Sequence, residues 1–230
     1  MEETKRSNYV FLRGAVCEAP HFSHESRDEP FYQFSLEICR LSGTPDTVNV
    51  LVRGELLDEL ELGGGEKLCV LGELRSFNNK SGVGPKLIIT VFAKELWFDD
   101  GEDENTVELS GTLCKAPNLR TTPLGREICD LMLAVNRAFG KSDYIPCIAW
   151  GRNAQFASRF HVGDRIRVTG RLQSREYQKL LENGEYMTRS AFEVSCFTLE
   201  ADVPPAEAPT DAALETAAET VEKDEQPVNV

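Results

Sequence analysis

The stretch that decides the fold class runs from Asp143 to Lys179 and reads DYIPCIAWGRNAQFASRFHVGDRIRVTGRLQSREYQK. Two strand-like runs flank a helix-like piece, and every second residue of 165–172 is apolar, as in a strand with one buried face. Aromatic and basic residues stand at the ends of these runs. A single strand of nucleic acid requires rings that stack on its bases and cations that bind its phosphates. The stretch therefore predicts the nucleic-acid face of a small β-barrel.

This stretch belongs to the second copy of an internal repeat, which a shift of 97 residues reveals. A period of that length is too long for a solenoid unit and indicates a duplicated domain. The alignment needs no gap up to Gly54 and one inserted residue after it. Identical pairs include Asn8 and Asn105, Gly14 and Gly111, Arg40 and Arg137, Asp46 and Asp143, Gly54 and Gly151, Gly72 and Gly170, Leu74 and Leu172, and Ser76 and Ser174.

Each copy shows the same order of five strands, with a short helix between the third and the fourth. This order predicts an all-β protein of two tandem five-stranded OB-fold barrels. The strands expected in the first copy are Tyr9–Val16, Phe31–Arg40, Thr47–Val52, Lys67–Arg75 and Leu87–Phe98, with a helix at Glu55–Leu60. Those expected in the second copy are Thr106–Leu113, Glu127–Arg137, Tyr144–Trp150, Arg165–Gln173 and Met187–Leu199, with a helix at Asn153–Arg159.

The domain boundaries follow from changes in composition along the chain. We expect a first OB domain over 8–98, an acidic linker over 99–104 and a second OB domain over 105–200. Residues 201–230 are rich in Ala, Pro, Glu, Thr and Asp and lack apolar periodicity, which predicts a disordered acidic tail. The net charge of −13 is unevenly spread: residues 8–98 carry 9 Lys and Arg against 13 Asp and Glu, and residues 105–200 carry 13 against 10. Only the second copy is basic.

The overall composition is that of an ordinary globular protein, with 41% hydrophobic and 27% charged residues. Seven cysteines without a Cys-x-x-Cys pair predict buried free thiols. No apolar run approaches the roughly 18 residues of a membrane helix, and the N-terminus lacks the apolar segment of a secretory signal. We therefore expect a cytoplasmic protein, associated with the nucleoid, that does not bind membranes.

Four aromatic residues of the second copy are candidates for stacking on bases: Phe139, Tyr144, Trp150 and Tyr177. They stand at strand ends or in expected loops. The alternative is that they pack inside the barrel, and for Trp150 the two interpretations are equally balanced. For Phe139 and Tyr177, which lie in polar surroundings, stacking is favoured.

Basic residues of the second copy are interleaved with these rings. Arg120 and Arg126 fall in the loop after the first strand, Lys141 in the next loop, and Arg175 and Lys179 in the loop between the last two strands, which border the groove of an OB barrel. The alternative is a solvated surface that keeps the protein soluble. The candidate phosphate-binding residues are Arg120, Arg126, Arg137, Lys141, Arg152, Arg171, Arg175 and Lys179.

Residues 105–200 resemble the bacterial single-stranded DNA-binding proteins over nearly their whole length. The similar segments are Gly111–Leu113, Ala116-Pro117, Arg120–Gly125, Leu133–Arg137, Ile148–Gly151 and Gly163–Tyr177. The resemblance implies single-stranded DNA as partner, bases stacked on the four rings, and a role in coating DNA during replication, recombination or repair. The tandem arrangement resembles a two-barrel group of such proteins in clostridia-like bacteria. Four barrels act together in the family, which implies a homodimer here.

The first copy and the tail depart from that family. The first copy has Ser42, Thr47, Arg53 and Asn79 at the positions of the four rings, so we expect an assembly or partner-binding domain. Two of its rings, Phe31 and Phe77, could substitute, but core packing is the favoured interpretation. The tail ends QPVNV, without the Pro-Phe tip by which family members recruit replication and repair proteins.

No constellation of residues indicates catalysis, a cofactor or a metal. His21-x-x-His24 lacks a third ligand, and Gly63-Gly64-Gly65-Glu66-Lys67 lacks the spacing of a phosphate loop. Three classes of function remain: a non-enzymatic single-stranded DNA-binding protein, an OB-fold module that binds other proteins without strong DNA binding, and an enzyme acting on nucleic acid. The first is favoured, and no residue supports the third.

Overall fold

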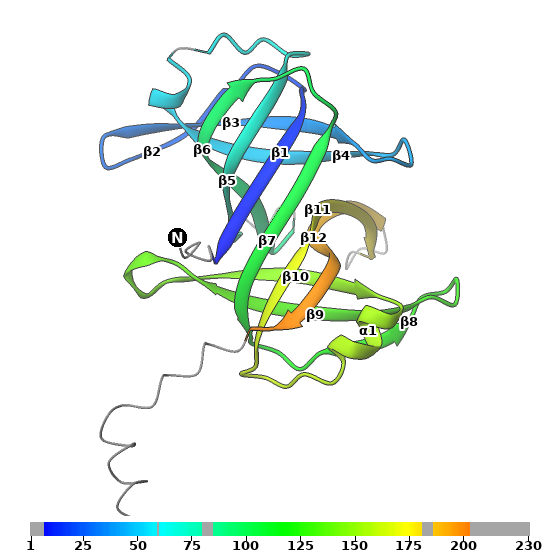
Figure 1. The fold of residues 1–230 in the computed structure, drawn as a ribbon. Helices are drawn as coiled ribbons and strands as arrows, with labels where there is room; N and C mark the ends of the chain where they lie inside the picture. Colours follow the sequence, from blue (N-terminus) through cyan, green and yellow to red (C-terminus); the bar gives the residue numbers. More distant parts are fainter. Residues whose placement is uncertain (1–6, 59, 80–84, 181–185, 203–230) are drawn as a thin grey trace, which may run out of the picture.

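The structure, a computed structural model, describes residues 7–58, 60–79, 85–180 and 186–202, and it describes the side chains of these residues except 176–180 and 186–190. The predicted disordered tail therefore lies outside the described residues, apart from its first two positions. Figure 1 shows two β-barrels, one above the other, with strands β1 and β7 running side by side between them.

The first barrel is built from the alternating patterns of the first copy. Along β1, Val10, Leu12, Gly14 and Val16 are buried, and the residues that alternate with them are half-buried. Its elements are β1 (Asn8–Val16), β2 (His21–Ser26), β3 (Glu29–Cys39), β4 (Pro45–Arg53), the 3-10 turn η1 (Gly54–Leu56), β5 (Lys67–Asn78) and β6 (Leu87–Phe98).

The second barrel repeats this order. Its core includes Leu109, Leu133, Ile145 and Leu172, none of which is exposed to solvent. Its elements are β7 (Glu104–Leu113), β8 (Asn118–Thr121), β9 (Glu127–Asn136), the 3-10 turn η2 (Ala138–Gly140), β10 (Ser142–Trp150), the helix α1 (Arg152–Ala157), β11 (Arg165–Leu180) and β12 (Tyr186–Ala201).

The strand order confirms the predicted pair of OB-fold barrels. Within each copy one parallel pairing, β4 with β6 and β10 with β12, is combined with antiparallel neighbours. The pairings of β1 with β3 and of β7 with β9 close the barrels. All twelve strands form one continuous sheet, because β1 pairs antiparallel with β7 from Asn8 opposite Leu109 to Arg13 opposite Glu104.

The junction of the two barrels has approximate twofold symmetry. The amide side chain of Asn8 exchanges two hydrogen bonds with the backbone of Leu74, at 2.8 and 2.9 Å. Its repeat partner Asn105 does the same with Leu172, at 2.7 and 2.9 Å. The aligned asparagines and leucines of the two copies therefore have the same structural role: each pair ties the first strand of its copy to the fourth strand predicted there.

The strands differ from the sequence prediction in number and length. Each copy has one strand more than the five expected, because the loops after β1 and β7 contain β2 and β8, which pair with β3 and β9. The long polar loop expected near the end is a β-hairpin, in which β11 and β12 pair as far as Leu180 and Tyr186. Arg175 and Lys179 therefore lie on a strand. The helix expected at Glu55–Leu60 is the single 3-10 turn η1, closed by a hydrogen bond from Leu57 N to Gly54 O.

The seven cysteines are free thiols, as expected, but only four are buried: Cys69, Cys129, Cys147 and Cys196. Cys17 and Cys39 are exposed, and Cys114 is half-buried. In the described part of the chain, no helix has the length and apolar character needed to cross a membrane.

Candidate nucleic-acid interface

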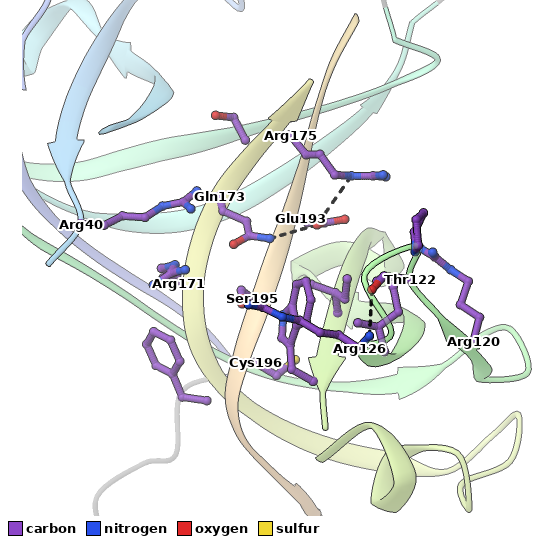
Figure 2. A pocket seen from close by; sticks show the side chains of 16 residues that line it. Arg40, Arg120, Thr122, Arg126, Arg171, Gln173, Arg175, Glu193, Ser195 and Cys196 are labelled. Atoms are coloured by element: carbon purple, nitrogen blue, oxygen red, sulfur yellow. Dashed lines mark hydrogen bonds and ion pairs between the residues drawn. The ribbon is translucent and has the colours of Figure 1, made fainter. Parts of the chain in front are cut away.

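The candidate site is a groove of about 670 Å³ on the second barrel, bounded by the β8–β9 hairpin and strands β10, β11 and β12 (Figure 2). Five arginines line it, against a single carboxylate, Glu193. The groove is therefore strongly basic in a chain whose net charge is −13. The five arginines are Arg40, Arg120, Arg126, Arg171 and Arg175.

Trp150 supplies the aromatic ring of the groove. It ends β10, is 37% exposed, and donates a hydrogen bond from its indole Nε1 to Ser195 Oγ at 3.2 Å. Because Ser195 is itself buried, this bond fixes one edge of the ring while part of its surface stays open. The structure thus places Trp150 at the surface of the groove, where a base can reach it, rather than inside the barrel.

Strand alternation places Tyr144 on the same outer face of β10 as Trp150. Asp143, Ile145 and Cys147, which alternate with this face, are buried, whereas Tyr144 is 50% exposed. The two residues are six positions apart along the strand, which corresponds to roughly 20 Å of backbone. The backbone N–H of Tyr144 donates to Ser76 Oγ of the first barrel at 2.8 Å, which anchors this end of the strand.

Phe139 and Tyr177 belong to two separate hairpins. Phe139 lies in η2, between β9 and β10, where its φ of 62° and a relative exposure of 99% leave the ring in solvent. The backbone of Tyr177 pairs with Arg189 in the β11–β12 hairpin, and its side chain lies outside the described residues. Of the four predicted rings, the structure places Trp150 in the groove, and Tyr144 on the same face of the same strand.

The predicted arginines of the groove differ in how far they are already paired. Arg120 donates two hydrogen bonds to Asp130, at 2.6 and 3.1 Å, so much of its charge is neutralised. Arg175 lies 3.9 Å from Glu193. For Arg126 no carboxylate partner occurs among the described residues; its backbone N–H is held by Thr122 Oγ1 at 3.1 Å.

Three other predicted cations do not line the groove. Arg137 forms two hydrogen bonds with Asp143 and contacts Ser76 O at 3.3 Å, so we assign it to the contact between the barrels. Lys141 follows η2, and Arg152 begins α1; both side chains are exposed. The side chain of Lys179 lies outside the described residues. The structure therefore brings Arg120, Arg126, Arg171 and Arg175 together in the groove, and it does not bring Arg137, Lys141 and Arg152 there.

Sequence reasoning missed one of the five groove arginines, Arg40, because it belongs to the first copy. Its repeat alignment with Arg137 was the only available signal, and that alignment says nothing about which barrel the side chain approaches.

The sequence also misplaced two rings of the first copy in the core. Phe77 is 42% exposed and lies beneath the Arg137 guanidinium, and Phe31 is half-buried and stacks on His24 at a centroid distance of 4.9 Å.

Within the described residues, no cluster of three or more His, Cys, Asp or Glu side chains could hold a metal ion. His21 and His24 both lie on the exposed strand β2. His24 contacts Ser23 Oγ at 3.1 Å as well as the ring of Phe31.

Comparison with known proteins connects this geometry to a family. Residues 104–198 match the Single-strand binding protein family. Single-stranded DNA-binding protein B of Bacillus subtilis is 36% identical over 81 residues, which are 32% of this chain and 72% of that protein. The chain belongs to the single-strand binding protein family.

Two further relatives of the family are similar over the same length. Single-stranded DNA-binding protein 2 of Listeria innocua is 40% identical, and single-stranded DNA-binding protein A of Bacillus subtilis is 41% identical, each over 81 residues. These residues are 32% of this chain and 51% and 47% of the two relatives. The chain thus spans about half the length of these curated relatives.

Solved structures match both barrels of this family member. A deletion mutant of the single-stranded DNA-binding protein from Thermus aquaticus aligns with a TM-score of 0.67 and 27% identity, over 87% of this chain and 98% of that one. The wild-type protein from the same organism aligns with a TM-score of 0.70 over 89% and 97%; at 24% identity it supports the fold alone. The two-barrel architecture is therefore shared with a solved member of the family.

Proposed function

We propose that this protein binds single-stranded DNA in the groove of its second barrel, without catalysing a reaction. The observation that carries this proposal is that the Trp150 ring lines the same groove as Arg126, Arg171 and Arg175. Membership of the single-strand binding protein family supports it. We propose further that the protein coats exposed single strands during replication, recombination or repair in the cytoplasm.

The physical basis is a combination of stacking and phosphate contacts. Stacking of a base on an aromatic side chain contributes about 1–3 kcal/mol and tolerates any base. From Trp150 the strand would follow the outer face of β10 toward Tyr144 and then Phe139, because these rings are exposed along one β-hairpin. Tyr177 and Lys179 would extend the contacts along the β11–β12 hairpin, and Arg120, Lys141 and Arg152 would add weaker phosphate contacts.

The decisive experiment is a fluorescence titration with oligo-dT. The chain has two tryptophans, so a Trp97→Phe variant isolates the emission of Trp150. Trp97 lies on β6 of the first barrel, 6.0 Å from Phe11, and not in the groove. We expect strong quenching of Trp150 emission by oligo-dT and weaker quenching by duplex DNA. The same titration with oligo-rU shows whether the protein prefers the deoxyribose or the ribose sugar. No quenching at low salt by any of the three would reject the proposal.

For the first copy we propose a role in assembly. It supplies β1 to β7 and a hydrogen-bond donor, Ser76 N, to Asp143 of the second barrel. Two such chains would bring four barrels together, so we propose a homodimer, which light scattering at several concentrations would test. Replication or repair proteins are proposed partners of the assembled form.

The alternative function is an OB-fold interaction module, and one observation favours it. Phe22, Trp97 and Phe98 of the acidic first copy are 58%, 38% and 49% exposed, and exposed rings are common at protein interfaces. If Trp150 emission is unaffected by nucleic acid, this module becomes the preferred function.

A further inference from the structure

One side chain of the first barrel projects into the groove of the second. Arg40 follows β3, and Figure 2 shows it approaching the same space as Arg171 and Gln173 of β11. It is placed there by Asp46, which accepts hydrogen bonds from Arg40 Nε at 2.6 Å and from Nη2 at 2.5 Å. Asp46 is 1% exposed and also accepts the backbone N–H of Ser174 at 3.3 Å. The Arg40–Asp46 pair is therefore fixed against the second barrel.

The pairing of Arg40 with Asp46 uses only part of its hydrogen-bonding capacity. A guanidinium group has five N–H donors, and this one leaves Nη1 without an acceptor among the described residues. Arg171 beside it has fewer partners still: its Nε is buried without a hydrogen-bond partner in the described part of the chain, and its guanidinium carbon lies 5.7 Å from the Phe197 ring centroid. Among the described residues Asp46 therefore pairs with Arg40 and not with Arg171, and donors without an acceptor remain on both guanidinium groups.

The electrostatics of this pair favour an additional anion. Burial, and then the nearby Arg40 guanidinium, lower the pKa of Arg171 from its ordinary value, and Asp46 offsets only part of this. Like charges held this close destabilise each other. An anion placed between them would relieve the repulsion and accept hydrogen bonds from Arg40 Nη1 and from the terminal nitrogens of Arg171. Arginine is the residue best suited to bind a phosphate group in this way, because its donors form a planar fork.

We infer that Arg40 and Arg171 together bind one backbone phosphate of the single strand, so that the first barrel contributes a direct contact to the groove of the second. This inference rests on the proposed function and deepens it. It also separates Arg40 from its repeat partner Arg137, whose pairing with Asp143 places it against Phe77 and Ser76 and not in the groove.

The test is a set of charge-matched variants titrated with fluorescein-labelled oligo-dT at four salt concentrations. In Arg40→Gln/Asp46→Asn the net charge is unchanged and no buried carboxylate is left unpaired. We expect this variant to bind roughly tenfold more weakly. The slope of log K against log salt should become less negative by at most about 0.7, the value for one whole phosphate contact on a single strand, because Arg171 still contacts the shared phosphate.

The matched control is Arg13→Gln/Asp99→Asn, which removes an ion pair of 3.1 Å from the first barrel outside the groove. It should bind like the wild type with the same salt slope. A second check combines Arg40→Gln/Asp46→Asn with Arg171→Gln: if both arginines hold one phosphate, the combined loss in affinity is smaller than the product of the separate losses.

The inference is overturned if Arg40→Gln/Asp46→Asn melts like the wild type and binds oligo-dT with unchanged affinity and slope. It is also overturned if its losses multiply fully with those of Arg171→Gln. These outcomes differ from failure of the proposed function, in which the wild-type protein itself does not bind oligo-dT.

Discussion

Arg137 and Arg171 are both arginines of the basic second copy, yet their surroundings give them different roles. Arg137 is paired with Asp143, which has no exposed surface, and it contacts the first barrel through Ser76. Arg171 lines the groove, where its Nε is buried without a hydrogen-bond partner among the described residues. The number of phosphate contacts expected therefore depends on the neighbours of each guanidinium group and not on the number of arginines.

Asp143→Ala should lower the free energy of unfolding by about 3–5 kcal/mol, because it leaves buried cationic groups without their carboxylate. Asp143 accepts hydrogen bonds from Arg137, from Arg75 at 3.4 Å and from Ser76 N at 2.5 Å. Urea denaturation measures the loss. The control is Asp130→Ala, which breaks the exposed pair with Arg120 and should change stability by less than about 1 kcal/mol. Equal losses in both variants would contradict a role for Asp143 in joining the barrels.

Trp150→Ala should weaken oligo-dT binding by about 1–3 kcal/mol, since one base loses its stacking partner. Fluorescence anisotropy with a labelled oligonucleotide measures the effect at fixed salt. A Trp97→Ala variant serves as control, because Trp97 packs on Phe11 in the first barrel. Affinity that falls equally in both variants would place the loss in general stability and not in the groove.

At the scale of elements, a β-bulge in each barrel permits a very close approach of two strands. Register shifts occur between Leu71 and Gly72 in the β5–β6 pair and between Thr169 and Gly170 in the β11–β12 pair. A Cβ atom at Gly72 would lie 2.3 Å from Phe92 O, and one at Gly170 only 2.2 Å from Ser195 O. This close approach of the backbones explains why both copies of the repeat have Gly at this position. The bulge of the second barrel lies next to Arg171.

Gly170→Ala should destabilise the protein by about 1–3 kcal/mol, because the backbone of β12 must move to admit the methyl group. The shift should also reduce oligo-dT affinity, since Arg171 and Ser195 border the groove on either side of the contact. Thermal melting and an oligo-dT titration check the two effects. Gly63→Ala is the matched control, because its nearest contact would be the Glu66 side chain at an ordinary 3.4 Å. A fully stable Gly170→Ala protein would show that the bulge can open.

The segment between β6 and β7 is held by acidic side chains that bind the first barrel. Hydrogen bonding from Gly101 N lowers the pKa of Asp99; burial opposes this, and the Arg13 guanidinium at 3.1 Å lowers it further. A carboxyl group with a lowered folded-state pKa contributes stability above its unfolded pKa, about 3.9, and loses that contribution as the pH falls through the folded value.

Asp99→Asn should therefore lower the melting temperature near neutral pH and have progressively less effect in acid. Melting curves of both proteins from about pH 6 to about pH 2 span the unfolded pKa and the values below it. The difference between wild type and variant should be constant above the unfolded pKa and shrink below it. A difference that grows on acidification would contradict the assignment.

At the scale of the whole molecule, two barrels of opposite charge share one sheet. The net charge of −13 arises because the acidic first copy and the segments outside the barrels outweigh the basic second copy, whose arginines gather in one groove. The pairing of β1 with β7 places the Arg40–Asp46 pair of the first barrel against β11 of the second. The acidic first barrel therefore contributes a cation, Arg40, to the basic groove of the second barrel.

Oligo-dT affinity should fall with salt, with a slope of log K against log salt of about −2 if Arg126, Arg171 and Arg175 each displace one counterion from a single strand. Titrations between low and physiological salt measure it. Arg120→Gln is the control, because Asp130 already neutralises Arg120 and the slope should change little. A slope near zero would mean that phosphate contacts do not contribute to binding.

The sequence by itself determined the two OB barrels and their order of strands. A strand of alternating apolar and polar residues can bury its apolar face in only one register. The periodicity and the repeat were therefore sufficient to predict these strands. The extra strands β2 and β8 and the long β11–β12 hairpin were not predictable in this way, because their residues are polar. These elements form by pairing with a neighbouring strand and not by burying an apolar face.

Tertiary structure alone decided which cations and rings share the groove. Asp46 and Ser174 are 128 positions apart and come into contact only because β1 pairs with β7. That contact places Arg40 in the groove. The equivalent contact of the second copy, between Asp143 and Ser76, holds Arg137 against the first barrel and away from the groove. A side chain's function here depends on neighbours supplied by the other barrel, and such neighbours leave no trace in local sequence.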